Sequence, residues 1–148
     1  MPSNLIDAYL RSLEATIRAI SRPAVGAVVD LLYGAWQERR QVFICGNGGS
    51  AATASHMAND LCKYTVVDGR PRLKAHALTD NVPLMTAWGN DTEYANIFSE
   101  PLKNYMEPKD ILIAISASGN SPNVLRAMEV ARQIGGVTVG LTGDTGGA

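Results

Sequence analysis

The sequence predicts an α/β protein, a three-layer sandwich whose parallel sheet is preceded by an N-terminal helical hairpin. From residue 41 onward, short apolar runs alternate with helical patterns, which is typical of a parallel sheet covered on both faces. Clusters of glycine or serine directly follow two of these runs. Residues 3–40 instead repeat apolar side chains every three or four positions, as amphipathic helices do.

The first forty residues are expected to form two helices. Apolar residues recur at helical spacing at Leu5, Ile6, Tyr9, Leu10, Leu13, Ile17 and Ile20. Ser21 and Pro23 separate this stretch from a second one that ends near Trp36, and proline suits the first turn of a new helix. The apolar faces exceed what one subunit can cover, which indicates packing in an oligomer.

Four strands are expected in the rest of the chain, at Gln41–Cys45, Lys74–Leu78, Ile111–Ile115 and Val137–Leu141. An Ala-rich helix fills 50–62, and Thr79-Asp80-Asn81 is expected to cap a short helix through Trp88 that Gly89-Asn90-Asp91 breaks. A further helix is expected over 93–105. The last one begins at Ser121-Pro122 and ends at Gly135-Gly136.

Composition limits the classes of function. The length of 148 residues suits a single domain over 1–148, with the helices in 1–40 and the α/β part in 41–148. A net charge of −1 without a basic block argues against nucleic-acid binding, and no segment reaches transmembrane length. Cys45 and Cys62 have neither disulfide nor metal-site spacing, so both are interpreted as small buried residues of a cytoplasmic protein.

The stretch VFICGNGGSAATASHMANDL, residues 42–61, joins a strand, a glycine loop and a helix. Asn47, Gly48 and Gly49 let the backbone approach a ligand closely, and Ser50 can cap the helix or donate to that ligand. The helix N-terminus favours an anion, but a nucleotide-triphosphate loop would require a lysine that is absent. From this loop alone, a dinucleotide site at Gly46-x-Gly48-x-x-Ala51 and a tight turn without a ligand both remain open.

The segment ILIAISASGNSPNVL repeats the arrangement with serines. Ser116, Ser118 and Ser121, with Gly119 and Asn120, supply more hydroxyl and amide groups than helix capping needs, as expected for a phosphate site. A serine nucleophile is disfavoured because no G-x-S-x-G motif is present. Both loops follow strand carboxyl ends, so together they predict one phosphorylated small molecule lying across a crevice.

Several motifs give the whole chain its resemblance to a known family: CGNGGSA at 45–51, ALTDN at 77–81, GND at 89–91, ISASGNSPNV at 115–124 and LTG at 141–143. With these motifs the chain resembles the sugar isomerase (SIS) domain family, whose sheet is flavodoxin-like. Within that family it is most similar to the phosphoheptose isomerases, which interconvert sedoheptulose 7-phosphate and a heptose 7-phosphate.

The resemblance implies roles for individual residues. Asn47, Gly48, Gly49 and Ser50 would line the substrate, and Asn90 and Asp91 would contact sugar hydroxyls. Ser116, Ser118 and Ser121 would hold the phosphate. Ala117 would line the substrate at a position where family members often carry threonine, so a hydroxyl that could orient substrate is lost.

The resemblance also implies chemistry on the Ala-rich helix. Family isomerases carry a His-x-x-x-Glu pair that supplies zinc ligands, and its glutamate moves the proton. Here the pair is His56 and Asp60, so Asp60 would be the catalytic base and both would be metal ligands. Taken without the family, a His and an Asp four apart on a helix are more often an ordinary polar pair. His76 is interpreted as structural.

Family members continue through another strand and a long helix that carry further zinc and acid–base residues, and the sequence has no counterpart of them. The expectation is therefore a phosphoheptose isomerase-like enzyme of carbohydrate metabolism whose ligand set is incomplete in this chain. The alternative is a non-catalytic SIS module that binds a sugar phosphate or a protein partner, as replication-initiator-associating relatives do. The resemblance implies a homotetramer. The cytoplasmic location and the lack of direct contact with nucleic acid or membrane are expected from the cysteines, the charge and the hydropathy pattern.

Overall fold

A computed structural model describes residues 2–143, 146 and 147. Contacts divide the chain into two compact units, residues 1–31 and 32–148. The first contains helix α1 (Pro2–Ala19) and most of α2 (Arg22–Glu38), the two predicted N-terminal helices. The apolar side chains of α1 are exposed; Leu13, the most covered of them, is still 42% accessible.

The second unit contains a parallel sheet, as the sequence predicts. The described strands are β1 (Gln41–Gly46), β2 (Lys74–Ala77), β3 (Ile111–Ser116) and β4 (Val137–Thr142), arranged in the order β2-β1-β3-β4. In the register, Val42 lies beside Ala75 on one side and beside Ile111 on the other. The chain therefore moves outward from β1 to β2 and then crosses to β3, which creates a switch point between β1 and β3.

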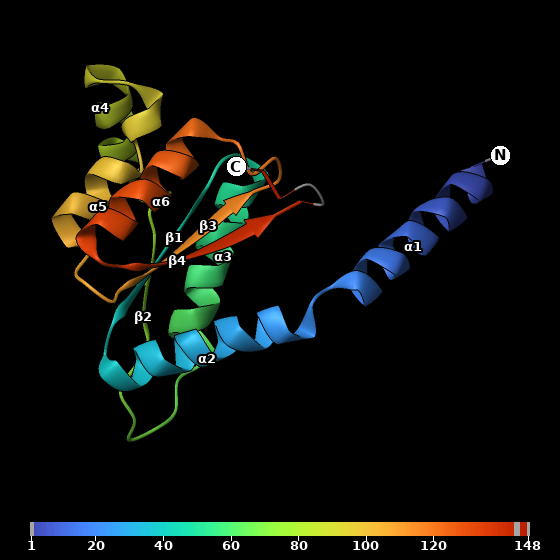
Figure 1. The fold of residues 1–148 in the computed structure, drawn as a ribbon, viewed down its shortest axis with the longest axis horizontal. Coiled ribbons are helices and arrows are strands. Elements are labelled where there is room, and N and C mark those ends of the chain that lie inside the picture. Colours follow the sequence, from blue (N-terminus) through green and yellow to red (C-terminus); the bar gives the residue numbers. More distant parts are fainter. Residues whose placement is uncertain (1, 144–145, 148) are drawn as a thin grey trace. The chain divides into compact units, whose positions relative to one another are not determined.

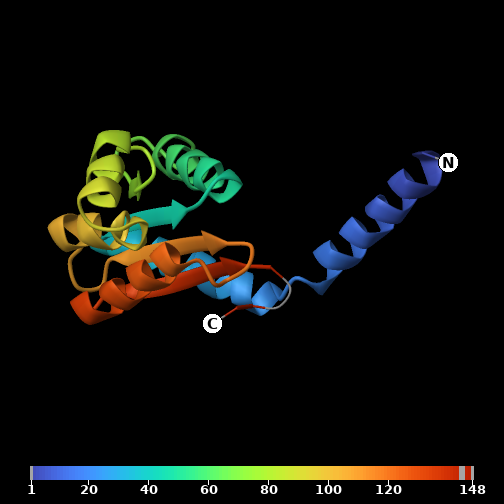
Figure 2. The same cartoon turned by 90° about the horizontal axis from the view of Figure 1, so that it is seen from above.

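Helices cover both faces of this sheet (Figures 1 and 2). The helix α3 (Gly49–Lys63) packs on β1 and β2, and α6 (Pro122–Ile134) packs on β3 and β4. Figure 2 shows α3 on one side of the strands and α6 on the other. The predicted three-layer α/β architecture is thus confirmed.

The core follows from the alternation of side chains along the strands. Phe43, Cys45, Leu112 and Ala114 join the buried cluster beneath α5 (Ser99–Tyr105) and α6. The intervening positions of the same strands, including Ile44 and Ile113, are equally buried on the opposite face. Buried on both faces, β1 and β3 form the rigid floor from which the two loops project.

Two local predictions are wrong. The helix α4 (Val82–Asp91) begins at the predicted cap, where the side chain of Asn81 accepts from the N–H of Leu84, but it runs through Gly89-Asn90-Asp91. The expected helix over 93–105 is divided into the 3₁₀ turn η1 (Tyr94–Asn96) and α5. The expected boundaries of α6 are confirmed, with Gly135 left-handed at φ 92° after its last residue.

None of the described helices is both long enough and apolar enough to cross a membrane.

Candidate functional site

The two loops singled out by their sequence lie at the same edge of the sheet. We call residues 46–50 the glycine corner and residues 116–121 the serine corner. The strands β1 and β3 are parallel neighbours with Gly46 opposite Ile115, so both corners follow the carboxyl ends of adjacent strands. They flank the switch point, where open α/β sheets bind small ligands.

Close packing in the glycine corner explains why its first residue, Gly46, is a glycine. A Cβ on Gly46 would lie 2.7 Å from the Cβ of Ser50 and 2.9 Å from the carbonyl oxygen of Ile115. Gly48 adopts φ +55° and allows the chain to turn into α3. In the first turn of α3 the N–H groups of Ser50 and Ala51 already donate to the carbonyl oxygens of Asn47 and Gly48. What this corner offers an anion is therefore chiefly the positive end of the helix dipole.

The hydroxyl groups of the serine corner are arranged differently from a simple helix cap. Ser121 occupies the N-cap position of α6, but its hydroxyl lies 3.1 Å from the hydroxyl of Ser116. Ser118 accepts from the N–H of Asn120 at 3.2 Å, and Gly119 turns the loop at φ +67°. Ala117 offers no hydroxyl, and its carbonyl accepts from the N–H of Gly143 at 3.1 Å.

A pair of amide side chains joins the two corners. The Nδ2 atom of Asn47 donates to Oδ1 of Asn123 at 2.9 Å, and Nδ2 of Asn123 donates to Oδ1 of Asn47 at 2.8 Å. The hydroxyl of Tyr94 donates to the same Asn47 oxygen at 3.2 Å. The glycine corner therefore contacts the start of α6, directly after the serine corner, through residues that are 76 positions apart in sequence.

Asn123 and Tyr94 were not among the residues selected from the sequence. The sequence does give one indication of Asn123. Asparagine is a poor helix former, yet here it occupies the first turn of a helix with an apolar inward face. Tyr94 gave no comparable signal. Its partner can be known only from the tertiary structure.

Asn90 and Asp91 lie in the last turn of α4, where Nδ2 of Asn90 donates to the Asp91 carboxylate at 2.9 Å. Both are exposed. They precede Tyr94 by a few residues, and Tyr94 links this segment to the glycine corner. The fold thus brings the 90–94 segment toward the corners, without a direct hydrogen bond from Asn90 or Asp91 to either corner among the described residues.

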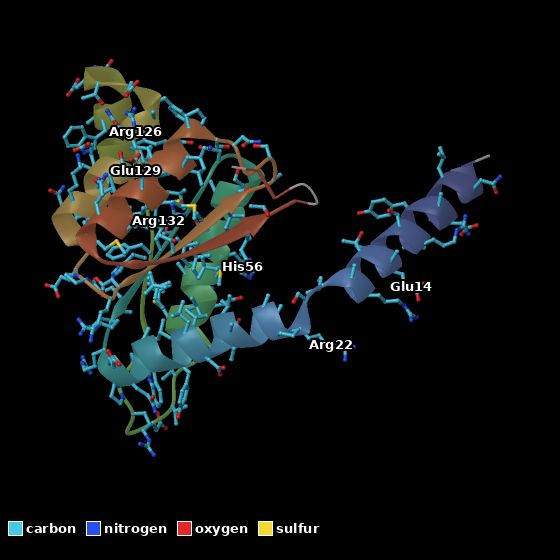
Figure 3. All side chains as sticks on the ribbon, viewed as in Figure 1. Glu14, Arg22, His56, Arg126, Glu129 and Arg132 are labelled. Atoms are coloured by element: carbon cyan, nitrogen blue, oxygen red, sulfur yellow. The ribbon has the colours of Figure 1, made fainter. Side chains whose placement is uncertain are left out.

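The candidate phosphate site has no basic side chain of its own. Neither corner contains lysine or arginine. Arg126, labelled in Figure 3 on α6, contacts the carboxylate of Glu93 and donates to Asn96 at 2.7 Å. An anion in the corners would therefore be held by neutral N–H and O–H donors together with helix dipoles.

His56 and Asp60 lie further along α3, on its solvent side (Figure 3 labels His56). Nε2 of His56 is 3.2 Å from Oδ2 of Asp60, and their side chains are 76% and 43% exposed. At 1.5 Å per residue, Asp60 is about 15 Å along the helix axis from Ser50. The structure thus pairs these two residues with each other rather than with the corners.

The same pair is too small a ligand set for zinc. Structural zinc sites use four protein ligands, and catalytic sites use three plus water. Among the described residues no group of three or more His, Cys, Asp or Glu side chains is placed to hold a metal ion. The residues present therefore do not fit a zinc site by themselves.

A groove of about 700 Å³ lies along the edge strand β2, away from the corners. The ring of His76 lines this groove and stacks on Phe43 with a centroid separation of 5.8 Å. The corners remain the better candidate for an anion, because they converge donors on one point.

A parallel α/β sheet with two donor-rich corners at its switch point is the architecture of proteins that bind small anionic ligands. Residues 7–143 match the SIS domain family, and the chain belongs to that family. The resemblance inferred from the sequence motifs is confirmed.

Several similar proteins carry the name phosphoheptose isomerase. The chain is 44% identical over 124 residues to the phosphoheptose isomerase of Mycobacterium tuberculosis (strain ATCC 25177 / H37Ra), which covers 84% of this chain and 63% of that protein. It is 41% identical over 147 residues to the phosphoheptose isomerase of Bordetella avium, covering 99% and 73%. The solved structure of a phosphoheptose isomerase from Francisella tularensis superposes with a TM-score of 0.91 at 32% identity, covering 100% and 78%.

The chain therefore spans 63% of the length of the mycobacterial relative.

Proposed function

We propose that this protein is a phosphosugar isomerase that interconverts sedoheptulose 7-phosphate and a heptose 7-phosphate. The observation that carries the proposal is the convergence of the glycine and serine corners, joined by Asn47 and Asn123, at one edge of the sheet. Membership of the SIS domain family and similarity to proteins named phosphoheptose isomerase support the same reading. Under this proposal, 1–148 act as one SIS domain.

The phosphate binds in the serine corner. Ser116, Ser118 and Ser121 donate hydroxyls to it, and the N-termini of α3 and α6 stabilise its charge. Asn47, Gly48, Gly49 and Ser50 line the adjoining part of the substrate, beside Ala117. Asn90 and Asp91 contact sugar hydroxyls from the end of α4.

The reaction is an aldose–ketose isomerisation through an enediol. A carboxylate removes a proton from one of the two reacting carbons and returns it to the other, and Asp60 is the proposed base. His56 lies 3.2 Å from that carboxylate and holds its orientation. Remote binding energy at the phosphate positions the carbon chain against the base.

An oligomeric state and a cellular compartment are also proposed. We propose a cytoplasmic homotetramer; the exposed apolar side chains of α1 support its self-association. The activity assay includes zinc as a variable, although His56 and Asp60 supply only two of the three or four protein ligands that a zinc site uses.

The test is incubation of the purified chain with sedoheptulose 7-phosphate in D₂O, with zinc and with a chelator, and product detection by NMR. We expect heptose 7-phosphate carrying solvent deuterium, because the transferred proton exchanges on the base. Asp60→Asn should lower kcat about 10²- to 10⁴-fold, the usual contribution of a general base.

The matched control is Asp68→Asn in the exposed loop before β2, which should leave turnover unchanged. Full activity in Asp60→Asn would show that the base is another residue. Tight binding of the sugar phosphate without turnover under either condition would favour the non-catalytic SIS module. Absence of both binding and turnover would overturn the proposal.

A further inference from the structure

Asn123 is a buried polar residue for which helix formation gives no reason. Its side chain lies in the first turn of α6 and is 2% exposed. It faces Asn47, which belongs to the glycine corner on the other side of the switch point. The two amides form a closed pair in which each donates to the other.

The orientation of both amides follows from one backbone donor. The N–H of Val124 lies 3.0 Å from Oδ1 of Asn123, and a backbone N–H can only donate, so that atom must be the oxygen. Nδ2 of Asn123 then faces Oδ1 of Asn47, and Tyr94 must donate its hydroxyl proton to that oxygen. A helix of the serine corner thereby fixes the orientation of a glycine-corner side chain.

Most of the hydrogen-bonding groups of the Asn47 side chain are then occupied. A carbonyl oxygen has two acceptor sites, and Asn123 and Tyr94 occupy both. Of the two N–H groups on Nδ2, one donates to Asn123. Asn47 can therefore offer a ligand an N–H donor and no acceptor, which suits an anion.

We propose that Asn123 is a positioning residue that holds Asn47 as an N–H donor and locks the glycine corner at the spacing from the serine corner that a sugar phosphate requires. The inference rests on the proposed function, since it assigns Asn123 a part in the same site. Tyr94 donates to the same Asn47 oxygen and connects the 90–94 segment to this arrangement. Asn123 itself does not touch the ligand and acts through Asn47.

A purely structural role for Asn123 predicts a different pattern. A buried amide that only stabilises the start of α6 would affect unfolding, and its loss would add independently to the loss of Asn47. A residue that acts through Asn47 should instead lose its effect on binding once Asn47 is gone. The two roles therefore separate in a double-mutant cycle on ligand affinity.

The experiment measures the dissociation constants of sedoheptulose 7-phosphate and of inorganic phosphate by calorimetry for wild type, Asn47→Ala, Asn123→Ala and the double variant. We expect Asn123→Ala to weaken binding of the sugar phosphate about tenfold, and less than twofold when Asn47 is already alanine. In the isomerase assay KM should rise about tenfold while kcat changes less than threefold, because Asn47 lies beside the phosphate end of the substrate, remote from the reacting carbons.

Two controls address folding. Ser99→Ala removes another fully buried polar group, and Asn104→Ala removes an exposed amide from α5; neither should alter affinity. Tyr94→Phe, at a 63% exposed position, avoids a buried cavity and should weaken binding about threefold through the same oxygen of Asn47.

The outcomes distinguish the two proposals. If wild type binds neither ligand, the proposed function fails and this inference fails with it. If wild type binds sugar phosphate but folded Asn123→Ala binds equally well, or its effect is the same with and without Asn47, the positioning role alone is overturned.

Discussion

At the scale of single residues, the two cysteines have different environments. Cys45 lies near the carboxyl end of β1 with no exposed surface, and burial raises the pKa of its thiol to about 12. Cys62, near the end of α3, is exposed, so its interpretation as a buried residue was wrong. The sequence could not distinguish these two environments. A cysteine in a helical pattern does not indicate whether it faces a buried strand or the edge strand β2.

Thiol labelling should therefore distinguish the cysteines. At pH 8 only about one in ten thousand Cys45 thiols is ionised, and burial also blocks access. We expect iodoacetamide to modify Cys62 alone in the native protein and both cysteines in urea, as read by mass spectrometry of tryptic peptides. Native labelling of Cys45 at a comparable rate would mean that β1 opens far more readily than its burial indicates.

At the scale of elements, the start of α6 shows what local sequence can specify. Serine before proline begins the helix and a left-handed glycine ends it, and the Gly136 N–H reaches back to the carbonyl of Ala131 at 2.8 Å. Both signals act within a few residues. The strands β1 and β3 were predicted for a similar reason, since continuous apolar runs fit a strand buried on both faces.

The two wrong predictions, for the end of α4 and for a single helix over 93–105, have different causes. One is close packing in the tertiary structure and the other is the ring of a proline. A glycine destabilises a helix by only about 1 kcal/mol relative to alanine, so α4 can continue through Gly89. Because Gly89 has no Cβ, α4 can lie close to Ile97, whose Cγ2 would be 3.4 Å from an added methyl group. Pro101 cannot donate to the carbonyl of Ile97, which disfavours one continuous helix over 93–105 by about 3 kcal/mol, and α5 begins just before the proline.

The junction of β1 and α3 gives a test of close packing. Gly46→Ala should destabilise the protein by about 1–3 kcal/mol, because its methyl would overlap Ser50 and the backbone of Ile115. Urea unfolding measures the change, and sugar-phosphate affinity should fall as the corners separate.

The control is Gly34→Ala in the middle of α2, where an added methyl meets nothing within 4 Å. It should leave affinity unchanged and stabilise the chain by about 0.5–1 kcal/mol. Equal stability of the Gly46→Ala and wild-type proteins would contradict the packing argument.

At the scale of the whole molecule, the sequence predicted that two corners share one edge of the sheet but not what joins them. Parallel strands place all their carboxyl ends at one edge, so this much follows from topology alone. The pairing of Asn47 with Asn123 and Tyr94 depends on side chains from three distant segments. No local pattern specifies such contacts, and the same limit applies to any partner of His56 and Asp60.

Assembly is the remaining property of the whole molecule that the chain indicates. Ile6, Leu10, Leu13 and Ile17 form a stripe along α1 at spacings of four, three and four, and each is at least 42% exposed. This spacing is typical of helices that pack on other helices. We expect the stripe to be buried against another copy of the chain in the proposed tetramer.

Replacing Leu10 and Ile17 with glutamate should therefore dissociate the assembly, because burying unpaired carboxylates is costly. Light scattering coupled to gel filtration should give four chains of 15.8 kDa for wild type and a smaller particle for the variant. Ala15→Glu, about half a turn away on the helix, should keep the wild-type mass. A monomeric wild type, or a double variant that stays tetrameric, would show that the stripe does not make the subunit contact.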